Sequence, residues 1–161
     1  MTILSEASEL IRILKEKGRK MSAAESCTGG LIGYSITDIP GASDVFLGSA
    51  VTYSNESKEN ILGVKHQTLL QYGAVSEETA REMVLGSIEV FQSDIAVSVT
   101  GIAGPGGATP DKPVGLVYIA VADGPRVIVT RNIFKGDRQS VRQQTAEEAI
   151  GLLKDLAEGR L

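Results

Sequence analysis

The sequence is poor in the residues that build several common kinds of protein site. It contains one cysteine, Cys27, one histidine, His66, and no tryptophan. One cysteine cannot form an internal disulfide, which suits a reducing compartment, so we expect a cytoplasmic protein. No CxxC or HExxH pattern is present, so neither a metal nor another cofactor is predicted. A Ser-His-Asp arrangement would depend on His66 alone, whereas a Ser-Lys arrangement remains open.

Long apolar runs and an excess of positive charge are missing as well. No apolar run has the length needed to span a bilayer, and the first residues, MTILSEASELIRILKEKG, lack the basic start and apolar block of a signal peptide. The formal net charge of -4 argues against a nucleic-acid-binding protein, which would need a basic face. A local cluster of donors can still hold a small anion on an acidic protein. We therefore predict a soluble protein that binds neither membranes nor nucleic acids.

Helix and strand patterns alternate along the chain, and its length suits a single domain over residues 1–161. Helices are predicted near residues 4–17, 28–39, 54–63, 66–71, 77–91 and 137–159. Strands are predicted near residues 21–25, 45–53, 94–101, 114–123 and 126–134. Helices and strands alternate early, and two adjacent strands come late. The pattern predicts an α/β protein with three α/β/α layers and a mixed, mostly parallel sheet.

The segment ESCTGG follows the first predicted strand, at a kind of junction where α/β proteins bind ligands. Ser26 or Thr28 would cap the next helix, and Gly29 and Gly30 would let a ligand approach the backbone. A simple cap is the plainer interpretation, but each glycine in the first turn weakens a helix by about 1 kcal/mol, which calls for a reason. Cys27 is either a rival nucleophile, activated by the helix N-terminus, or a small buried apolar residue.

Three further junctions carry polar residues. TYSNESK places Lys58 in the first turn of a helix capped by Ser54 or Asn55, where the helix dipole and burial would lower the lysine pKa; the alternative is a solvated lysine. TGIAGPGG opens a glycine-rich loop, which is either an anion-binding concavity or a mobile surface loop. KGDRQS places Arg138 behind the cap Asp137, where a bound phosphate or carboxylate would explain it; otherwise it is an exposed arginine.

Taken together, these junctions resemble the CinA C-terminal domain family. The stretches that carry the resemblance run from about Ser22 to the last helix: AESCTGGLIGYSITDIPGAS, VTYSNESKENILGV, YGAVSEETAREM, SVTGIAGPGGATPDKPVGLVYIAV and GDRQSVR. Stand-alone members include the nicotinamide-nucleotide amidohydrolases (NMN deamidases). Their reaction converts nicotinamide mononucleotide to nicotinate mononucleotide and ammonia, in pyridine nucleotide (NAD) recycling. Larger members carry an additional N-terminal domain, and because this chain starts close to the motif, we expect that domain to be absent.

The resemblance implies a metal-free mechanism in which Ser26 is the nucleophile, with Lys58 and Tyr53 handling its proton; which of the two is the base stays open. Backbone N–H groups from Thr28 to Gly30 would form the oxyanion hole. The nucleotide would be bound by Thr28, Gly29, Gly30, Thr100, Gly101, Gly104 and Arg138. A nucleotide-binding module without activity, or an amidase for another nucleotide carboxamide, is the alternative. Tyrosine and apolar residues late in the chain are candidates for the interface of an expected homo-oligomer.

Overall fold

A single sheet organises the molecule. The computed structural model describes residues 2–161, so Met1, the first residue of the predicted domain, lies outside the described residues. Five strands form the sheet in the order β2-β1-β3-β4-β5. β1 pairs in parallel with β2 and β3, whereas β4 is antiparallel to both β3 and β5. The strands are β1 (Met21–Glu25), β2 (Phe46–Val51), β3 (Ile95–Gly101), β4 (Leu116–Asp123) and β5 (Arg126–Ile133).

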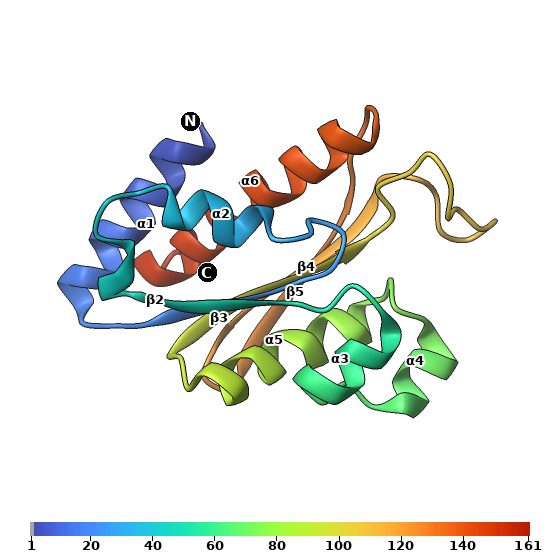
Figure 1. The fold of residues 1–161 in the computed structure, drawn as a ribbon, viewed down its shortest axis with the longest axis horizontal. Coiled ribbons are helices and arrows are strands. Elements are labelled where there is room, and N and C mark those ends of the chain that lie inside the picture. Colours follow the sequence, from blue (N-terminus) through green and yellow to red (C-terminus); the bar gives the residue numbers. More distant parts are fainter. Residues whose placement is uncertain (1) are drawn as a thin grey trace.

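These pairings mean that every strand except β4 runs in the same direction, so the prediction of a mixed, mostly parallel sheet is confirmed. Helices cover both faces of the sheet (Figure 1). One face carries α1 (Ile3–Lys17), α2 (Leu31–Thr37) and α6 (Arg138–Glu158). The other face carries α3 (Asn55–Leu62), α4 (His66–Tyr72) and α5 (Glu77–Phe91). This arrangement confirms the three predicted layers.

The pleat of each strand sends neighbouring side chains into opposite layers. In β3, Val97 and Val99 join the apolar cluster that contains α1 and α6, whereas Ala96 packs in the cluster that contains α5. In β1, Ala23 belongs to the first of these layers and Ala24 packs with residues of α3, α4 and α5. Adjacent residues at the end of β1 are therefore directed toward different helical layers.

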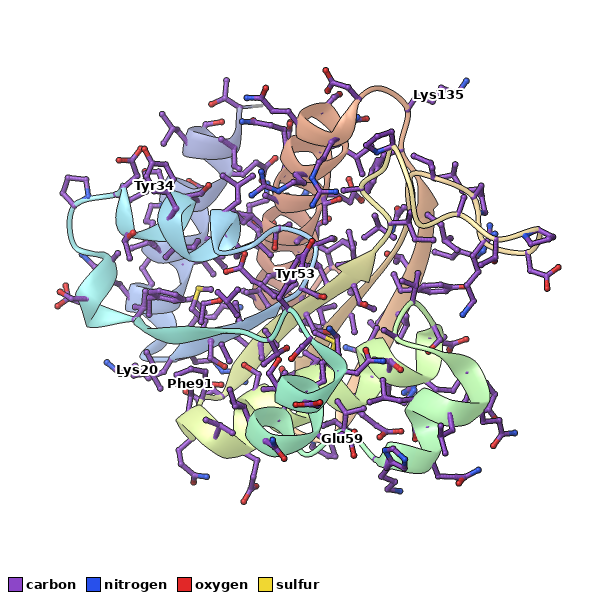
Figure 2. All side chains as sticks on the ribbon, turned by 45° about the vertical axis from the view of Figure 1, so that its right-hand side comes forward. Lys20, Tyr34, Tyr53, Glu59, Phe91 and Lys135 are labelled. Carbon is purple, nitrogen blue, oxygen red and sulfur yellow. The ribbon has the colours of Figure 1, made fainter. Side chains whose placement is uncertain are left out.

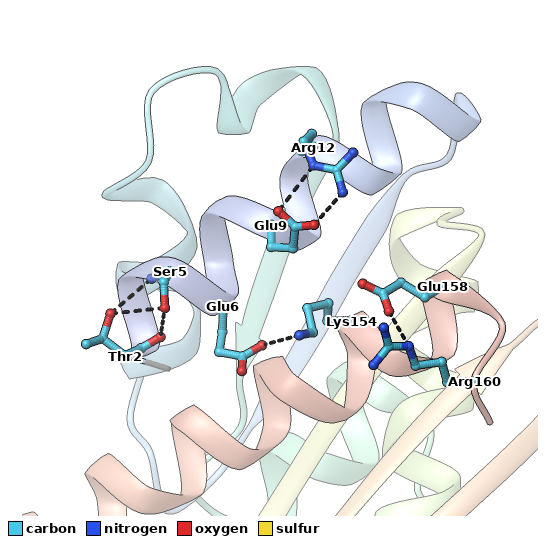
Figure 3. A network of polar contacts seen from close by, with 8 residues as sticks. All are labelled: Thr2, Ser5, Glu6, Glu9, Arg12, Lys154, Glu158 and Arg160. Carbon is cyan, nitrogen blue, oxygen red and sulfur yellow. Dashed lines mark hydrogen bonds and ion pairs between the residues drawn. The ribbon is translucent and has the colours of Figure 1, made fainter.

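The helices at the two ends of the chain, α1 and α6, pack side by side. Leu10 of α1 and Leu153 of α6 are fully buried in one shared cluster. At the edge of this contact, Lys154 Nζ of α6 lies 3.0 Å from Glu6 Oε2 of α1 (Figure 3). The packing fixes α6 on the sheet, and its first turns reach the carboxyl ends of the parallel strands.

Helix starts agree with the predicted caps except in α2. Side chains of Ser54, Ser76 and Asp137 cap α3, α5 and α6. Helix α2 begins at Leu31, three residues later than predicted, and its N-cap residue Gly30 makes no side-chain cap. The prediction that Ser26 or Thr28 caps this helix is therefore wrong. A short 3-10 helix, Ala42–Asp44, follows α2 before β2 begins. Within residues 2–161, we find no helix with the length and apolar character needed to cross a membrane.

Candidate active site

The carboxyl ends of β1, β2 and β3 meet at one edge of the sheet, where a cavity of about 280 Å³ opens. From β1 the chain passes to β2 on one side and later to β3 on the other, so this edge is a topological switch point. Ligands of open α/β sheets bind at such points. The cavity brings together seven of the residues predicted from the sequence: Ser26, Tyr53, Lys58, Thr100, Gly101, Gly104 and Arg138.

A buried Ser-Lys pair lies at the inner end of this cavity. Lys58 Nζ donates a hydrogen bond of 2.8 Å to Ser26 Oγ. Lys58 shares the buried face of α3 with Leu62, one turn later, and its side chain is only 1% exposed. Ser26 is the residue after β1, and the alternation along that strand directs its side chain toward the α3 layer. The solvated surface lysine considered from the sequence is excluded by this burial.

The surroundings of Lys58 favour the neutral amine. Its Nζ also donates to the carbonyl oxygens of Thr52 at 2.8 Å and Tyr53 at 3.2 Å. Burial lowers the pKa of Lys58 to about 8, and the Cys27 side chain opposes that shift slightly. No carboxylate among the described residues forms an ion pair with it. A neutral amine has two N–H groups and one lone pair, so the two carbonyls can take its hydrogens while the lone pair accepts the Ser26 hydroxyl hydrogen.

Glu25, the residue before Ser26, caps helix α2 with its carboxylate. The side chain is fully buried and accepts five hydrogen bonds. Oε1 receives Thr28 Oγ1, Gly30 N and Ile32 N, whereas Oε2 receives Gly33 N and Ser49 Oγ. A carboxylate is well placed at a helix N-terminus, where free N–H groups and the dipole favour negative charge. The electropositive tip of α2 is thus filled by the protein itself.

This capping corrects part of the predicted substrate site. Thr28, Gly29 and Gly30 are absent from the cavity lining, although they follow Ser26 closely. The Thr28 hydroxyl and the Gly30 N–H are bonded to Glu25, and the Gly29 N–H donates to the Ser26 carbonyl. The Thr28 hydroxyl and the N–H groups of Gly29 and Gly30 are already paired, so a substrate-binding role for these three groups is not supported. The N–H groups of Gly29 and Gly30 are for the same reason unsuited to an oxyanion hole.

Cys27 also lines the cavity, but it packs in the apolar layer of α1 and α6. It belongs to the largest buried cluster, and burial raises the pKa of its thiol to about 11. The thiolate is the nucleophilic form of cysteine, so this thiol is poorly reactive at neutral pH. Of the two interpretations left open by the sequence, the structure favours the buried apolar residue over the rival nucleophile.

Arg142 of α6 holds the turn that follows Ser26. Its Nε donates to the Cys27 carbonyl at 3.1 Å, and its Nη2 donates to the Thr28 carbonyl at 2.8 Å. Gly29 adopts a left-handed conformation with φ +60°, and a Cβ at this position would lie 3.4 Å from Arg142 Nη2. The glycine therefore allows the left-handed conformation of the turn and leaves room for the Arg142 side chain.

The outer end of the cavity is held by Arg138, the first residue of α6. Its Nη1 donates to the Gly104 carbonyl at 2.7 Å, and its Nη2 donates to the Tyr53 hydroxyl at 3.1 Å. Tyr53 is 63% exposed and is labelled at the β2–α3 turn in Figure 2. Lys58 contacts the Tyr53 carbonyl and not its phenol. A direct proton relay through the Tyr53 hydroxyl is therefore not supported by the described contacts.

The end of β3 forms a wall of the cavity. The Thr100 hydroxyl donates 2.8 Å to the Ala74 carbonyl, which anchors the segment before α5. A Cβ on Gly101 would lie 2.6 Å from Val117 Cγ2 and 2.7 Å from the Leu116 carbonyl oxygen. Packing against β4 thus explains the glycine at position 101. Across the described chain, we find no group of three or more His, Cys, Asp or Glu side chains placed to hold a metal ion.

Sequence reasoning assigned no role to Glu25 or Arg142, although both lie in the stretches that suggested a site. Glu25 is an acidic residue that ends a buried apolar strand, and that position asks for several donors. Arg142 lies one helical turn after Arg138, so both side chains leave the same side of α6. The sequence shows both residues, but their partners, mostly backbone groups, are not specified by any residue pattern.

Fold and site together define a class of protein, a three-layer α/β domain with a buried Ser-Lys pair at the carboxyl edge of its parallel strands. Residues 4–157 match the CinA C-terminal domain. The chain belongs to the CinA C-terminal domain family, as its motifs suggested.

Relatives and solved structures agree with this assignment. A CinA-like protein of Syntrophomonas wolfei is 52% identical over 141 residues, covering 88% of this chain and 34% of the relative. A competence-damaged protein (CinA) superfamily structure from Klebsiella pneumoniae has a TM-score of 0.95 at 30% identity, with 99% of each chain covered. The competence/damage inducible protein CihA from Agrobacterium tumefaciens has a TM-score of 0.93 at 40% identity, covering 96% of this chain and 94% of that one. The chain spans about a third of the length of its CinA-like relatives.

Proposed function

We propose that the protein hydrolyses the carboxamide of nicotinamide mononucleotide to nicotinate mononucleotide and ammonia, through an acyl-enzyme on Ser26. The observation that carries the proposal is the 2.8 Å contact between Lys58 Nζ and Ser26 Oγ, buried and without a carboxylate partner among the described residues. A nucleophilic serine needs an adjacent base, and a lysine with a lowered pKa supplies one. The specific substrate comes from the resemblance to the nicotinamide-nucleotide amidohydrolases.

Acylation begins when Ser26 Oγ attacks the carboxamide carbon while its proton passes to Lys58 Nζ. The resulting tetrahedral intermediate carries a negative oxygen. When the C–N bond breaks, Lys58 returns the proton to the leaving nitrogen, which departs as ammonia. The carbonyls of Thr52 and Tyr53 hold the other two hydrogens of Lys58, so Nζ stays aimed at Ser26 throughout the step.

Deacylation uses the same base. Water attacks the Ser26 ester, Lys58 accepts the water proton, and the proton then returns to Ser26 Oγ as the ester bond breaks. The products are the nucleotide carboxylate and free enzyme, and the overall balance is one carboxamide plus one water giving one carboxylic acid plus one ammonia.

Charge in the cavity supports an anionic substrate. Its lining contains the cation Arg138, and no carboxylate lines it within the described part of the chain. Arg138 is exposed, and among residues 2–161 it donates hydrogen bonds only to the neutral oxygens of Gly104 and Tyr53, so a phosphate offers it a stronger, charge-assisted partner. We assign the phosphate to this outer end, which leaves the nicotinamide ring near Ser26, with Thr100, Gly101 and Gly104 along the wall between them.

The test is ammonia release from nicotinamide mononucleotide by purified protein, with and without EDTA, for the wild type, Ser26→Ala and Cys27→Ala. We expect release that survives EDTA, persists in Cys27→Ala and falls by at least about a thousandfold in Ser26→Ala. No release from folded wild-type protein would contradict the proposal. In that case, binding of the nucleotide by calorimetry would indicate the alternative of an inactive nucleotide-binding module. Release from a different nucleotide carboxamide would retain the mechanism and change the substrate.

A further inference from the structure

Arg142 lies outside the cavity, yet it controls the backbone directly after Ser26. Its two hydrogen bonds reach consecutive carbonyls, those of Cys27 and Thr28. Arg142 comes from α6, on the opposite face of the sheet from Lys58 and α3. The guanidinium therefore pulls two carbonyls toward the α6 side of the turn.

Peptide geometry converts this pull into an orientation for N–H groups. A trans peptide is planar, so the N–H of one residue points opposite to the carbonyl of the residue before it. With the Cys27 carbonyl directed at Arg142, the Thr28 N–H points away from α6, toward the layer that holds Lys58. The Gly29 N–H follows the same rule and donates to the Ser26 carbonyl at 3.1 Å.

The Thr28 N–H is available, as is that of Cys27, since neither donates a hydrogen bond within the described residues. By contrast, the N–H groups of Gly29, Gly30 and Leu31 all have acceptors. On the other side of the turn, Glu25 fixes the Thr28 hydroxyl at 2.7 Å. The hydroxyl and the carbonyl of Thr28 are thus both fixed by hydrogen bonds, whereas its N–H has no acceptor among the described residues.

We propose that Arg142 is a positioning residue that presents the Thr28 N–H to the negative oxygen formed when Ser26 attacks the substrate. The proposal rests on the proposed function for its substrate, but only on a nucleophilic Ser26 for its chemistry. Arg142 touches neither Ser26 nor the cavity. Its loss should therefore slow the chemical step and leave substrate binding largely unchanged.

The experiment compares the wild type with Arg142→Lys, Arg142→Ala and the control Arg81→Ala, which removes an exposed arginine on α5. Two quantities are measured: kcat and KM for nicotinamide mononucleotide, and the rate at which phenylmethanesulfonyl fluoride modifies Ser26, followed by peptide mass. Sulfonylation joins the Ser26 oxygen to sulfur and releases fluoride, with the serine proton passing to Lys58. It needs no nucleotide, so it tests the turn independently of the proposed substrate.

We expect Arg142→Ala to lower kcat and the sulfonylation rate by about a hundredfold, as for the loss of one oxyanion donor, with KM within about threefold of the wild type. Arg142→Lys should retain part of the rate, because an ammonium can hold one of the two carbonyls. Methylguanidinium in the buffer should restore part of the lost rate to Arg142→Ala but not change Arg81→Ala. A merely structural arginine would not give this split between kcat and KM or this rescue.

The outcomes distinguish a failure of the positioning role of Arg142 from a failure of the proposed function. Sulfonylation of Arg142→Ala and Arg142→Lys at the wild-type rate overturns the positioning role, whatever the nucleotide result. A wild type that is sulfonylated at Ser26 but releases no ammonia from nicotinamide mononucleotide contradicts the proposed function alone. If Arg142→Ala does not fold, a wild-type rate in folded Arg142→Lys combined with a raised KM would equally overturn the positioning role.

Discussion

Two glycine-rich segments border the same cavity, but one is buried and held by hydrogen bonds, whereas the other is largely exposed. The turn over residues 25–30 is buried or half-buried, except for exposed Gly29, and its polar groups are tied to Glu25 and Arg142. The loop beyond β3 becomes exposed from Pro105 through Asp111. A Cβ on Gly106 would meet nothing within 4 Å. Composition alone would give both segments the same role, that of a backbone surface for an anion.

The comparison shows that a glycine-rich segment can bind an anion only where its backbone N–H groups have no partner within the protein. In the turn, the carboxylate of Glu25 takes the N–H groups of α2 that a phosphate would otherwise use. In the loop, one pinned point, the Gly104 carbonyl on Arg138, leaves the following residues open to solvent. The inner segment is therefore built to hold Ser26 still, and the outer segment is the better candidate for contacts with a variable ligand.

Removal of the Glu25 carboxylate is expected to have the largest effect on stability. Glu25→Ala leaves up to five buried or part-buried donors without a partner, at about 1–3 kcal/mol for each buried one, so we expect a loss of at least about 4 kcal/mol in the free energy of unfolding. Glu25→Gln keeps one oxygen acceptor and should lose about half as much. Urea denaturation measures both, with the exposed Glu148→Ala as control. A Glu25→Ala protein as stable as Glu148→Ala would show that the turn is not held in this way.

Lys58 should give the molecule a pH-dependent stability. Its pKa of about 8 in the folded protein lies below the ordinary value of 10.5, so the unfolded chain binds the proton more tightly. Stability relative to Lys58→Met should therefore rise with pH between about 8 and 10.5, by about 3 kcal/mol in total. Lys135→Met, at an exposed position labelled in Figure 2, removes the same charge and serves as control. A constant difference between wild type and Lys58→Met across this range would contradict the buried lysine.

Alanine substitutions at Gly101 and Gly106 should show that the first position of the glycine-rich segment is closely packed and the second is open to solvent. Gly101→Ala places a Cβ against Val117 and the Leu116 carbonyl, so we expect a loss of about 2 kcal/mol in the free energy of unfolding. Gly106→Ala meets no atom and should change stability by less than about 0.5 kcal/mol. Thermal melts of both variants provide the measurement. Equal losses at the two positions would remove the contrast between them.

Most of the fold could be predicted from the sequence, because hydrophobic periodicity and side-chain caps are local signals. Ser54, Ser76 and Asp137 mark their helices directly. The start of α2 was misjudged, since its cap is a carboxylate that lies five residues upstream of Gly30 and reaches forward across the turn. No local pattern of cap residues describes that arrangement.

The residues of the candidate site likewise fall into those that local sequence signals predicted and those that they did not. Lys58 and Arg138 stood out because each is a cation at a helix start, and Ser26 because two glycines closely follow it; the structure gathers the three in one cavity. Roles for the Tyr53 phenol, the Thr28 hydroxyl and the Gly29 and Gly30 N–H groups were not supported, because sequence position gives no direction for a hydroxyl or an N–H. Arg142 was overlooked since its partners are two carbonyls that lie more than a hundred residues away.

The most direct test of the central claim is the pH dependence of Ser26 sulfonylation by phenylmethanesulfonyl fluoride between pH 6 and 10, in the wild type, Lys58→Met and Cys27→Ala. If neutral Lys58 takes the serine proton, the wild-type rate rises about tenfold per pH unit and levels off above a midpoint near its pKa of about 8. Cys27→Ala should follow the same curve, and Lys58→Met should be slow throughout. A rate without a midpoint in this range, a curve unchanged in Lys58→Met, or modification at Cys27 would contradict the Ser-Lys account.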